Sequence, residues 1–134
     1  MWTQENWYNE AKKWAAENRD FLQKMSALFL NMLKNHIPDR EESEIINLVL
    51  QYSQKRLNTP VNFKKYPELR GMKELISAEW KGIRDGAGFD DRLTAVYTNG
   101  MNFYHRMICT GKIGNMEVKS QSARCSYIFF PESD

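Results

Sequence analysis

The sequence has few cysteines and histidines, which limits how it can be cross-linked or bind a metal. Its 134 residues include two cysteines, Cys109 and Cys125, and two histidines, His36 and His105. Two cysteines form at most one bridge, so a disulfide scaffold is a weak interpretation for a chain of this size and apolar content. Because no Cys-x-x-Cys or His-x-x-x-His spacing occurs, we expect no metal site. We expect no cofactor of another kind either.

Long hydrophobic runs and blocks of one charge are also missing. The longest apolar cluster, around residues 27–33, is interrupted by Asn31 and is too short to cross a bilayer. The 19 basic and 17 acidic residues are mixed along the chain, which gives no electrostatic reason to expect nucleic acid or a membrane as a partner. The first residues do not resemble a signal peptide, so we expect a cytoplasmic location if Met1 is the native start.

What the sequence does contain is typical of one globular domain: 42% of its residues are hydrophobic and 13% are aromatic. Apolar residues recur at three- and four-residue spacing, which predicts about four helices. They are expected over residues 4–35, over residues 40–56, from Pro67 to the glycine turn at 86–88, and from Asp90 or Asp91 onward. Asn99 and Gly100 weaken the continuation of the fourth helix.

Aromatic and glycine-rich segments raise the question of a ligand site. The four tryptophans and residues 25–32 would suit a pocket, but at helical spacing such side chains more often belong to a core, and we assign them there. The glycines at 86–88 lack the lysine and preceding strand of a phosphate loop, so they predict a helix stop. Asp90 and Asp91 suit an acid pair, but a helix cap explains both.

The C-terminal segment SQSARCSYIFFPESD, residues 120–134, contains the most strand-like part of the sequence. A polar connector covers about residues 111–124, and a strand is predicted at residues 127–130. The predicted fold class is therefore α+β, mainly helical with one terminal β-strand. Because a single strand cannot satisfy its backbone hydrogen bonds, its partner strands are expected in sequence that is not present.

Several short motifs follow one another in a specific order between Tyr66 and Phe130. They are Tyr66-Pro67 at a helix start, GIRDGAG at 82–88, an acidic pair at 90–91, Leu93 with Val96, Asn99 and, after the connector, a cysteine that opens an apolar strand in ARCSYIFF at 123–130. In this order and spacing the chain resembles the penicillin acyltransferase family of autoprocessing N-terminal-nucleophile (Ntn) hydrolases. Arg124 and Ser126 stand where glycine and threonine are common in that family.

The resemblance implies a precursor. Residues 1–124 would be a helical pro-segment, and residues 125–134 the truncated first strand of the catalytic chain of an αββα Ntn-hydrolase fold. The Cys125 thiol would attack the carbonyl of Arg124, and cleavage would free an α-amino group that serves as the base for the same thiol. The mature enzyme would hydrolyse linear amides or transfer acyl groups through a thioester, and the fragment alone would be inactive.

The implied partners are a small-molecule amide or acyl-donor substrate and the chain's own downstream catalytic part, which would also supply the oxyanion hole. A second hypothesis needs no catalysis. In it the chain is a small helical binding or interaction module, Cys125 is structural, and the last strand pairs with a partner. Cys109 is expected in the core, and His105 on a helix surface, although it could be proposed as a base for either cysteine.

Overall fold

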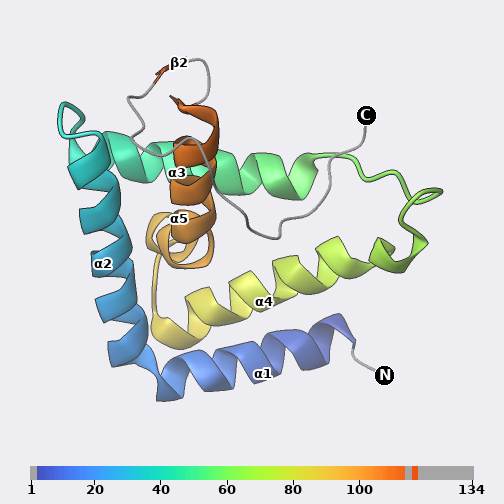
Figure 1. Ribbon diagram of the computed structural model, residues 1–134. Helices are drawn as coiled ribbons and strands as arrows, with labels where there is room; N and C mark the ends of the chain where they lie inside the picture. The colour runs from blue at the N-terminus through green and yellow to red at the C-terminus, as the bar shows by residue number, and fades with distance from the viewer. Residues whose placement is uncertain (1–2, 114–115, 118–134) are drawn as a thin grey trace.

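The computed structural model describes residues 3–113 and 116–117 of the chain. Its secondary structure consists of α-helices, one short 3-10 helix and a pair of two-residue antiparallel strands. The elements are α1 (Gln4–Glu17), α2 (Arg19–His36), α3 (Glu42–Asn58), η1 (Pro67–Leu69), α4 (Met72–Ala87), α5 (Asp91–Thr110), β1 (Lys112–Ile113) and β2 (Met116–Glu117). In Figure 1, α1 and α4 lie side by side, α2 and α3 form two further sides of a frame, and α5 lies inside it.

The first helix predicted from the sequence is two helices, because the chain breaks at Asn18. The Asn18 backbone N–H donates to the carbonyl of Trp14, and its side-chain Nδ2 donates to the same oxygen at 2.9 Å. Asn18 thereby satisfies a carbonyl at the end of α1 and gives α2 a new direction. Ala15 and Leu22, on either side of the break, are both fully buried in one cluster. The apolar spacing of the sequence therefore continues across the break.

Local chemistry fixes the ends of α4 and α5. Gly71 and Gly88 adopt left-handed conformations on either side of α4, with φ of 82° and 70°. The Asp90 carboxylate accepts a hydrogen bond of 2.8 Å from the backbone N–H of Leu93 and so caps α5. The predicted helix stop at residues 86–88 and the cap at Asp90 are therefore confirmed, whereas Pro67 begins η1 and α4 starts only after Gly71.

Helix α5 is longer than the sequence predicts. It continues through Asn99 and Gly100 to Thr110, and Gly111 ends it with a φ of 65°. Gly100 packs on Phe29 of α2, where an added Cβ would lie 3.2 Å from the Phe29 Cβ. Close packing of the two helices therefore outweighs the low helix propensity of Asn99 and Gly100.

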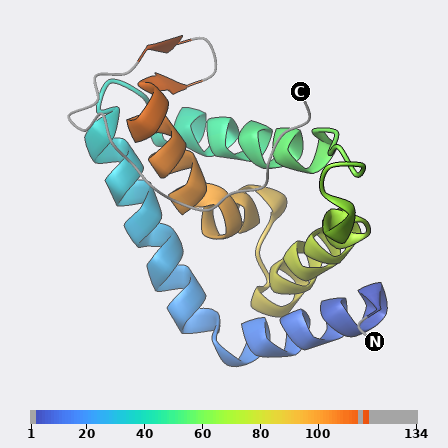
Figure 2. The same ribbon diagram turned by 45° about the vertical axis from the view of Figure 1, so that its right-hand side comes forward.

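Two hydrophobic clusters lie at opposite ends of α2. Figure 2 shows this helix running from the end of α1 to the start of α3. The larger cluster joins the C-terminal half of α2 to α3 and α5, and its buried members are Leu33, Ile37, Ile45, Val49, Ala95, Phe103 and Met107. The smaller cluster joins the α1–α2 junction to the end of α4, through Ala15, Leu22, Ile83, Ala87 and Phe89. The α1–α4 pair is thus held to the rest of the domain mainly at one end.

The pairing of α1 with α4 depends on two glycines. Helices α1 and α4 run in the same direction, so that Gly82 faces Tyr8 and Ala11, while Gly86 faces Lys12 and Ala15. A Cβ built at Gly82 would lie 2.9 Å from the Ala11 Cβ, and one at Gly86 would lie 3.0 Å from the Ala15 Cβ. Because both would also overlap backbone atoms of α1, only glycine allows the two helices to approach this closely.

The predicted α+β architecture of about four helices followed by one terminal strand, as the leading part of an αββα fold, is wrong for the described residues. These residues form five α-helices, and their strands are limited to the β1–β2 pair, with Lys112 opposite Glu117 and Ile113 opposite Met116. The helices bury their apolar faces against one another, so no sheet is needed to cover them. The predicted strand at 127–130 and the boundary at 124–125 lie outside the described residues.

Candidate binding site

The structure does not describe the residues that the sequence predicts to carry catalysis. Arg124 and Cys125 lie outside the described residues, so the processing site stays a prediction. Cys109 is partly exposed in the last turn of α5 and is disulfide-bonded. The sequence has two cysteines. If the disulfide of Cys109 is formed within this chain, Cys125 has no free thiol and cannot act as a nucleophile until the bond is reduced.

Asn99, which belongs to the motif series, has a structural role. Its side chain is fully buried, and its Oδ1 accepts a hydrogen bond of 2.7 Å from Arg56 of α3. The amide nitrogen donates to Thr98 Oγ1 at 2.8 Å. The Arg56 guanidinium also lies 5.7 Å from the centre of the Tyr52 ring. Asn99 thus ties α5 to α3 through a charge-assisted hydrogen bond.

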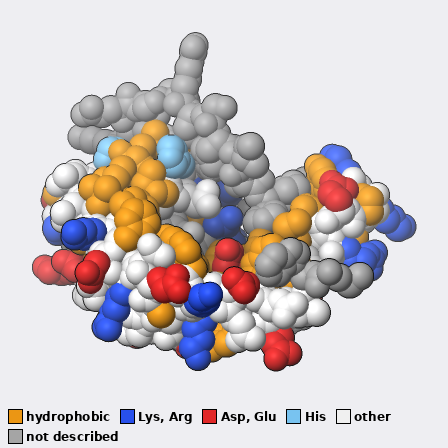
Figure 3. Space-filling view, turned by 90° about the horizontal axis from the view of Figure 1, so that it is seen from below, with side chains coloured by type: hydrophobic (Ala, Val, Ile, Leu, Met, Phe, Trp, Pro, Cys, Tyr) orange, Lys and Arg blue, Asp and Glu red, His pale blue; other side chains and the backbone are white. Residues whose placement is uncertain are grey.

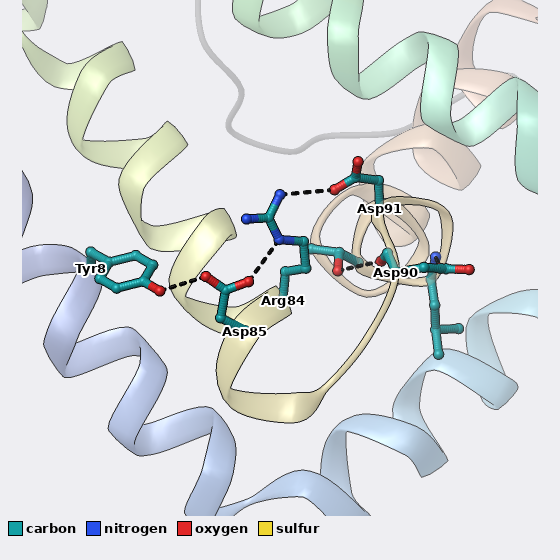
Figure 4. A network of polar contacts seen from close by, with 7 residues as sticks. Tyr8, Arg84, Asp85, Asp90 and Asp91 are labelled. Carbon is teal, nitrogen blue, oxygen red and sulfur yellow. Dashed lines mark hydrogen bonds and ion pairs between the residues drawn. The ribbon is translucent and has the colours of Figure 1, made fainter.

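A chain of polar contacts crosses from α1 to the start of α5, as Figure 4 shows. The Tyr8 hydroxyl donates to Asp85 Oδ2 at 2.5 Å, and Arg84 contacts Asp85 Oδ1 at 2.9 Å and Asp91 Oδ1 at 3.1 Å. Hydrogen bonds from Arg84 and Tyr8 lower the pKa of Asp85, and the bond to Asp85 raises the pKa of Tyr8. Asp85 is therefore ionised at neutral pH and is a structural acceptor.

A pocket of about 760 Å³ lies between α1, α2, α4 and α5. Each helix contributes residues from one face: positions 7, 10, 11 and 14 of α1, positions 21, 25 and 29 of α2, and positions 79, 80 and 83 of α4. The lining residues are Trp7, Glu10, Ala11, Trp14, Phe21, Met25, Phe29, Glu79, Trp80, Ile83, Tyr97 and Thr98. Six of these twelve side chains are aromatic, so the pocket is apolar with few polar groups.

The pocket is open to solvent along α1 and α2. Trp14 retains 42% of its surface exposed, and Phe21 retains 49%. Trp7 and Trp80 are partly buried. The assignment of the tryptophans to the core is therefore wrong for Trp14, and Trp7 and Trp80 line a pocket as well as packing between helices.

Glu79 is the acidic group that α4 brings to the pocket. It is partly buried, and burial raises the pKa of its carboxyl. Tyr97 of α5 lines the same pocket, and its pKa is raised by burial and by the charge of Glu79. Among the described residues, no hydrogen bond or ion pair engages the Glu79 side chain.

A second, smaller cleft of about 250 Å³ lies between α3, α4 and α5. Trp80 and Thr98 line both cavities, so they separate the two. The smaller cleft contains Lys81, Arg84 and Asp91, whereas none of the described residues that line the larger pocket is basic. The two cavities therefore differ in charge as well as in size.

Comparisons with known proteins give the chain no relative: no family model, curated protein or solved structure matches it. Within the described helices, none is long and apolar enough to span a membrane. In residues 3–113 and 116–117, no three or more His, Cys, Asp and Glu side chains gather as metal ligands would. On the face shown in Figure 3, acidic and basic side chains are interspersed, so this face carries no field of one sign.

Proposed function

We propose that this helical domain is a binding module that holds a small apolar organic molecule in the pocket between α1, α2, α4 and α5. The observation that carries the proposal is the pocket itself. Its volume of about 760 Å³ falls within the range of roughly 300–1,000 Å³ common for small-molecule sites. Its lining, half of it aromatic and with few polar groups, is also typical of such sites.

The packing of the domain supports a pocket that exists before the ligand binds. The close contact of Gly82 and Gly86 with α1 fixes one wall, and the buried Leu22 anchors the start of α2 beside it. Phe21 and Trp14 leave apolar surface in contact with water. Covering about 100 Å² of such surface would contribute about 2.5 kcal/mol to binding. A ligand would therefore gain affinity at little cost in rearrangement.

Replacement of Phe21 tests this proposal. We expect Phe21→Ala to weaken the binding of an apolar aromatic probe about tenfold, since a loss of about 1.4 kcal/mol corresponds to that factor. Leu28→Ala is the matched control, because Leu28 lies on the same helix, is 48% exposed against 49% for Phe21, and does not line the pocket. Titration followed by tryptophan fluorescence measures both variants. Equal affinities of the two variants would contradict the proposal.

Processing between Arg124 and Cys125 is a second proposal, and the resemblance of residues 66–130 to penicillin acyltransferases supports it. It concerns a reaction of the chain and not the described pocket, so the two proposals are independent. The structure gives four residues of the motif series local roles: Gly82 and Gly86 in helix packing, Gly88 in a helix stop and Asn99 in a buried hydrogen bond. These roles are equally compatible with either proposal.

Intact-mass measurement tests the processing reaction. With reductant present, and with any coding sequence that follows residue 134 included, we expect the chain to break between Arg124 and Cys125. Cys125→Ala should abolish the break, because no thiol remains to attack the Arg124 carbonyl. Cys109→Ala is the control and should leave the break unchanged. A reduced chain that stays uncut, or one that is cut in the Cys125→Ala variant, would refute the mechanism.

A further inference from the structure

We infer that the molecule bound in the apolar pocket carries a positive charge: its class is a small organic cation with an apolar body, such as an arylalkylammonium. The inference rests on the proposed function, because it names the class of ligand for that same pocket. It depends on three features of the lining: the sign of its charges, the lack of an ion pair for Glu79 among the described residues, and the aromatic side chains that line the same pocket.

Two of the described side chains that line the pocket are charged, and both are acidic. Glu10 comes from α1 and Glu79 from α4, and no lysine or arginine is among the twelve lining residues. The nearby smaller cleft has the opposite balance, with Lys81 and Arg84 against Asp91. Lys81 and Arg84 of α4 thus line one cavity, and Glu79 of the same helix lines the other. A ligand in the larger pocket therefore meets a negative field.

Glu79 gains the most from a cationic ligand. Its carboxylate is partly buried, and in the part of the chain that the structure describes no basic side chain forms an ion pair with it. Removal of a carboxylate from water disfavours its ionised form unless an opposite charge lies near. The raised pKa of Glu79 agrees with this description, since burial is its cause. A cation in the pocket would supply the missing opposite charge.

The aromatic lining favours the same class of ligand. Trp80 follows Glu79 on α4, and Trp7 and Trp14 face the pocket from α1. The faces of tryptophan rings attract organic cations, and they do so most strongly where water is excluded. In a pocket that combines a carboxylate with several aromatic rings, the carboxylate binds the charge of an alkylammonium group and the rings bind the apolar groups around it. Neutral apolar ligands would use the rings but leave Glu79 without a partner.

A matched pair of probes separates this inference from the proposed function. Benzyltrimethylammonium and neopentylbenzene have the same shape, and they differ in the charge at one central atom. We expect the wild-type protein to bind the cation about tenfold more tightly, since a favourable contact of a cation with aromatic rings and a carboxylate has about this effect. Titrations followed by NMR give both dissociation constants. Binding of the neutral probe alone, or equal binding of the two, would overturn the inference and leave the proposed function standing.

Glu79→Gln tests the role of the carboxylate. This variant keeps the shape of the side chain, so we expect it to fold, to bind neopentylbenzene as the wild type does, and to lose most of the preference for the cation. Glu74→Gln is the control, because Glu74 lies exposed on α4 and outside the pocket lining. A Glu79→Gln variant that keeps the full preference would refute the assignment. If neither probe binds the wild type, both the inference and the proposed function fail.

The wild-type protein provides a second test that needs no variant. Glu79 has a raised pKa, so its carboxyl is partly protonated at acid pH and becomes ionised as the pH rises. Glu10 of α1 also faces the pocket, Tyr97 of α5 stays neutral because its pKa is raised above 10, and α2 contributes no titratable side chain to the lining. The affinity for benzyltrimethylammonium should therefore rise several-fold between about pH 4 and pH 7. The affinity for neopentylbenzene should not change, and a parallel rise for both probes would overturn the inference.

Discussion

Gly86→Ala should destabilise the domain by about 2–3 kcal/mol, although alanine is the better helix former. In an exposed helix the same change would stabilise by about 1 kcal/mol. Here the added Cβ would overlap the backbone carbonyl of Lys12 and lie 3.0 Å from the Ala15 Cβ. A backbone group cannot rotate away as the end of a side chain can, so α1 and α4 must separate. The free energy of unfolding in urea measures the loss.

Gly100→Ala is the matched control for this prediction. Gly100 also lies inside a helix, so alanine brings the same gain in helix propensity. Its added Cβ would meet the side chain of Phe29, with the nearest atom at 3.2 Å, and that side chain can shift by a few tenths of an ångström. We expect the stability to change by less than about 1 kcal/mol. If Gly86→Ala is as stable as Gly100→Ala, α1 does not pack on α4 as described.

Asn99→Ala should cost about 2 kcal/mol of stability. The change removes a fully buried amide and leaves Arg56 without the acceptor that now lies 2.7 Å away. Loss of one partner from a buried hydrogen bond to a charged group costs roughly 1.5–3 kcal/mol. Asn102→Ala is the control, because Asn102 lies partly exposed on the same helix. We expect this control to stay within about 0.5 kcal/mol of the wild type in urea unfolding.

A double-mutant cycle shows whether the cost arises from the contact with Arg56. If it does, Arg56→Met should destabilise much less in the Asn99→Ala background than in the wild type, with a coupling energy of at least about 1 kcal/mol. Independent effects of the two changes would mean that Asn99 stabilises the domain in another way. The cycle also tests why asparagine occupies position 99, which is one of the motifs between Tyr66 and Phe130. A large coupling energy would mean that Asn99 is needed there for stability.

The helices and several of their ends could be predicted from the sequence because the signals are local. Apolar spacing located the helical regions, and the chemistry of Gly88 and Asp90 fixed the end of α4 and the start of α5. The apolar spacing does not predict the break at Asn18, since it continues from Ala15 to Leu22 through the junction. An asparagine between two helix-forming segments is compatible with both a cap and an exposed helical position, and only tertiary packing decides between them.

The pocket could not be predicted for a related reason. Spacing shows that Phe21, Met25 and Phe29 share one face of α2, but it does not show whether another helix fills that face. The structure places α1 and α4 across from it without closing the space. One signal was present in the sequence: Glu79 interrupts the apolar stripe of α4 beside Trp80. A glutamate among apolar positions is rarely buried in a closely packed core without a partner. Its presence in the stripe therefore indicates a place where the carboxylate contacts solvent or a ligand.

The most direct test of the central claim follows the indole N–H signals of the tryptophans in a ¹⁵N-correlated NMR spectrum while benzyltrimethylammonium is added. Trp7, Trp14 and Trp80 all line the pocket, so binding there predicts that their three signals shift together and saturate with one dissociation constant. Single tryptophan-to-phenylalanine variants assign the signals. If the three signals stay unchanged, or move without saturation while signals elsewhere saturate, the pocket does not bind this cation and the account of the ligand is contradicted.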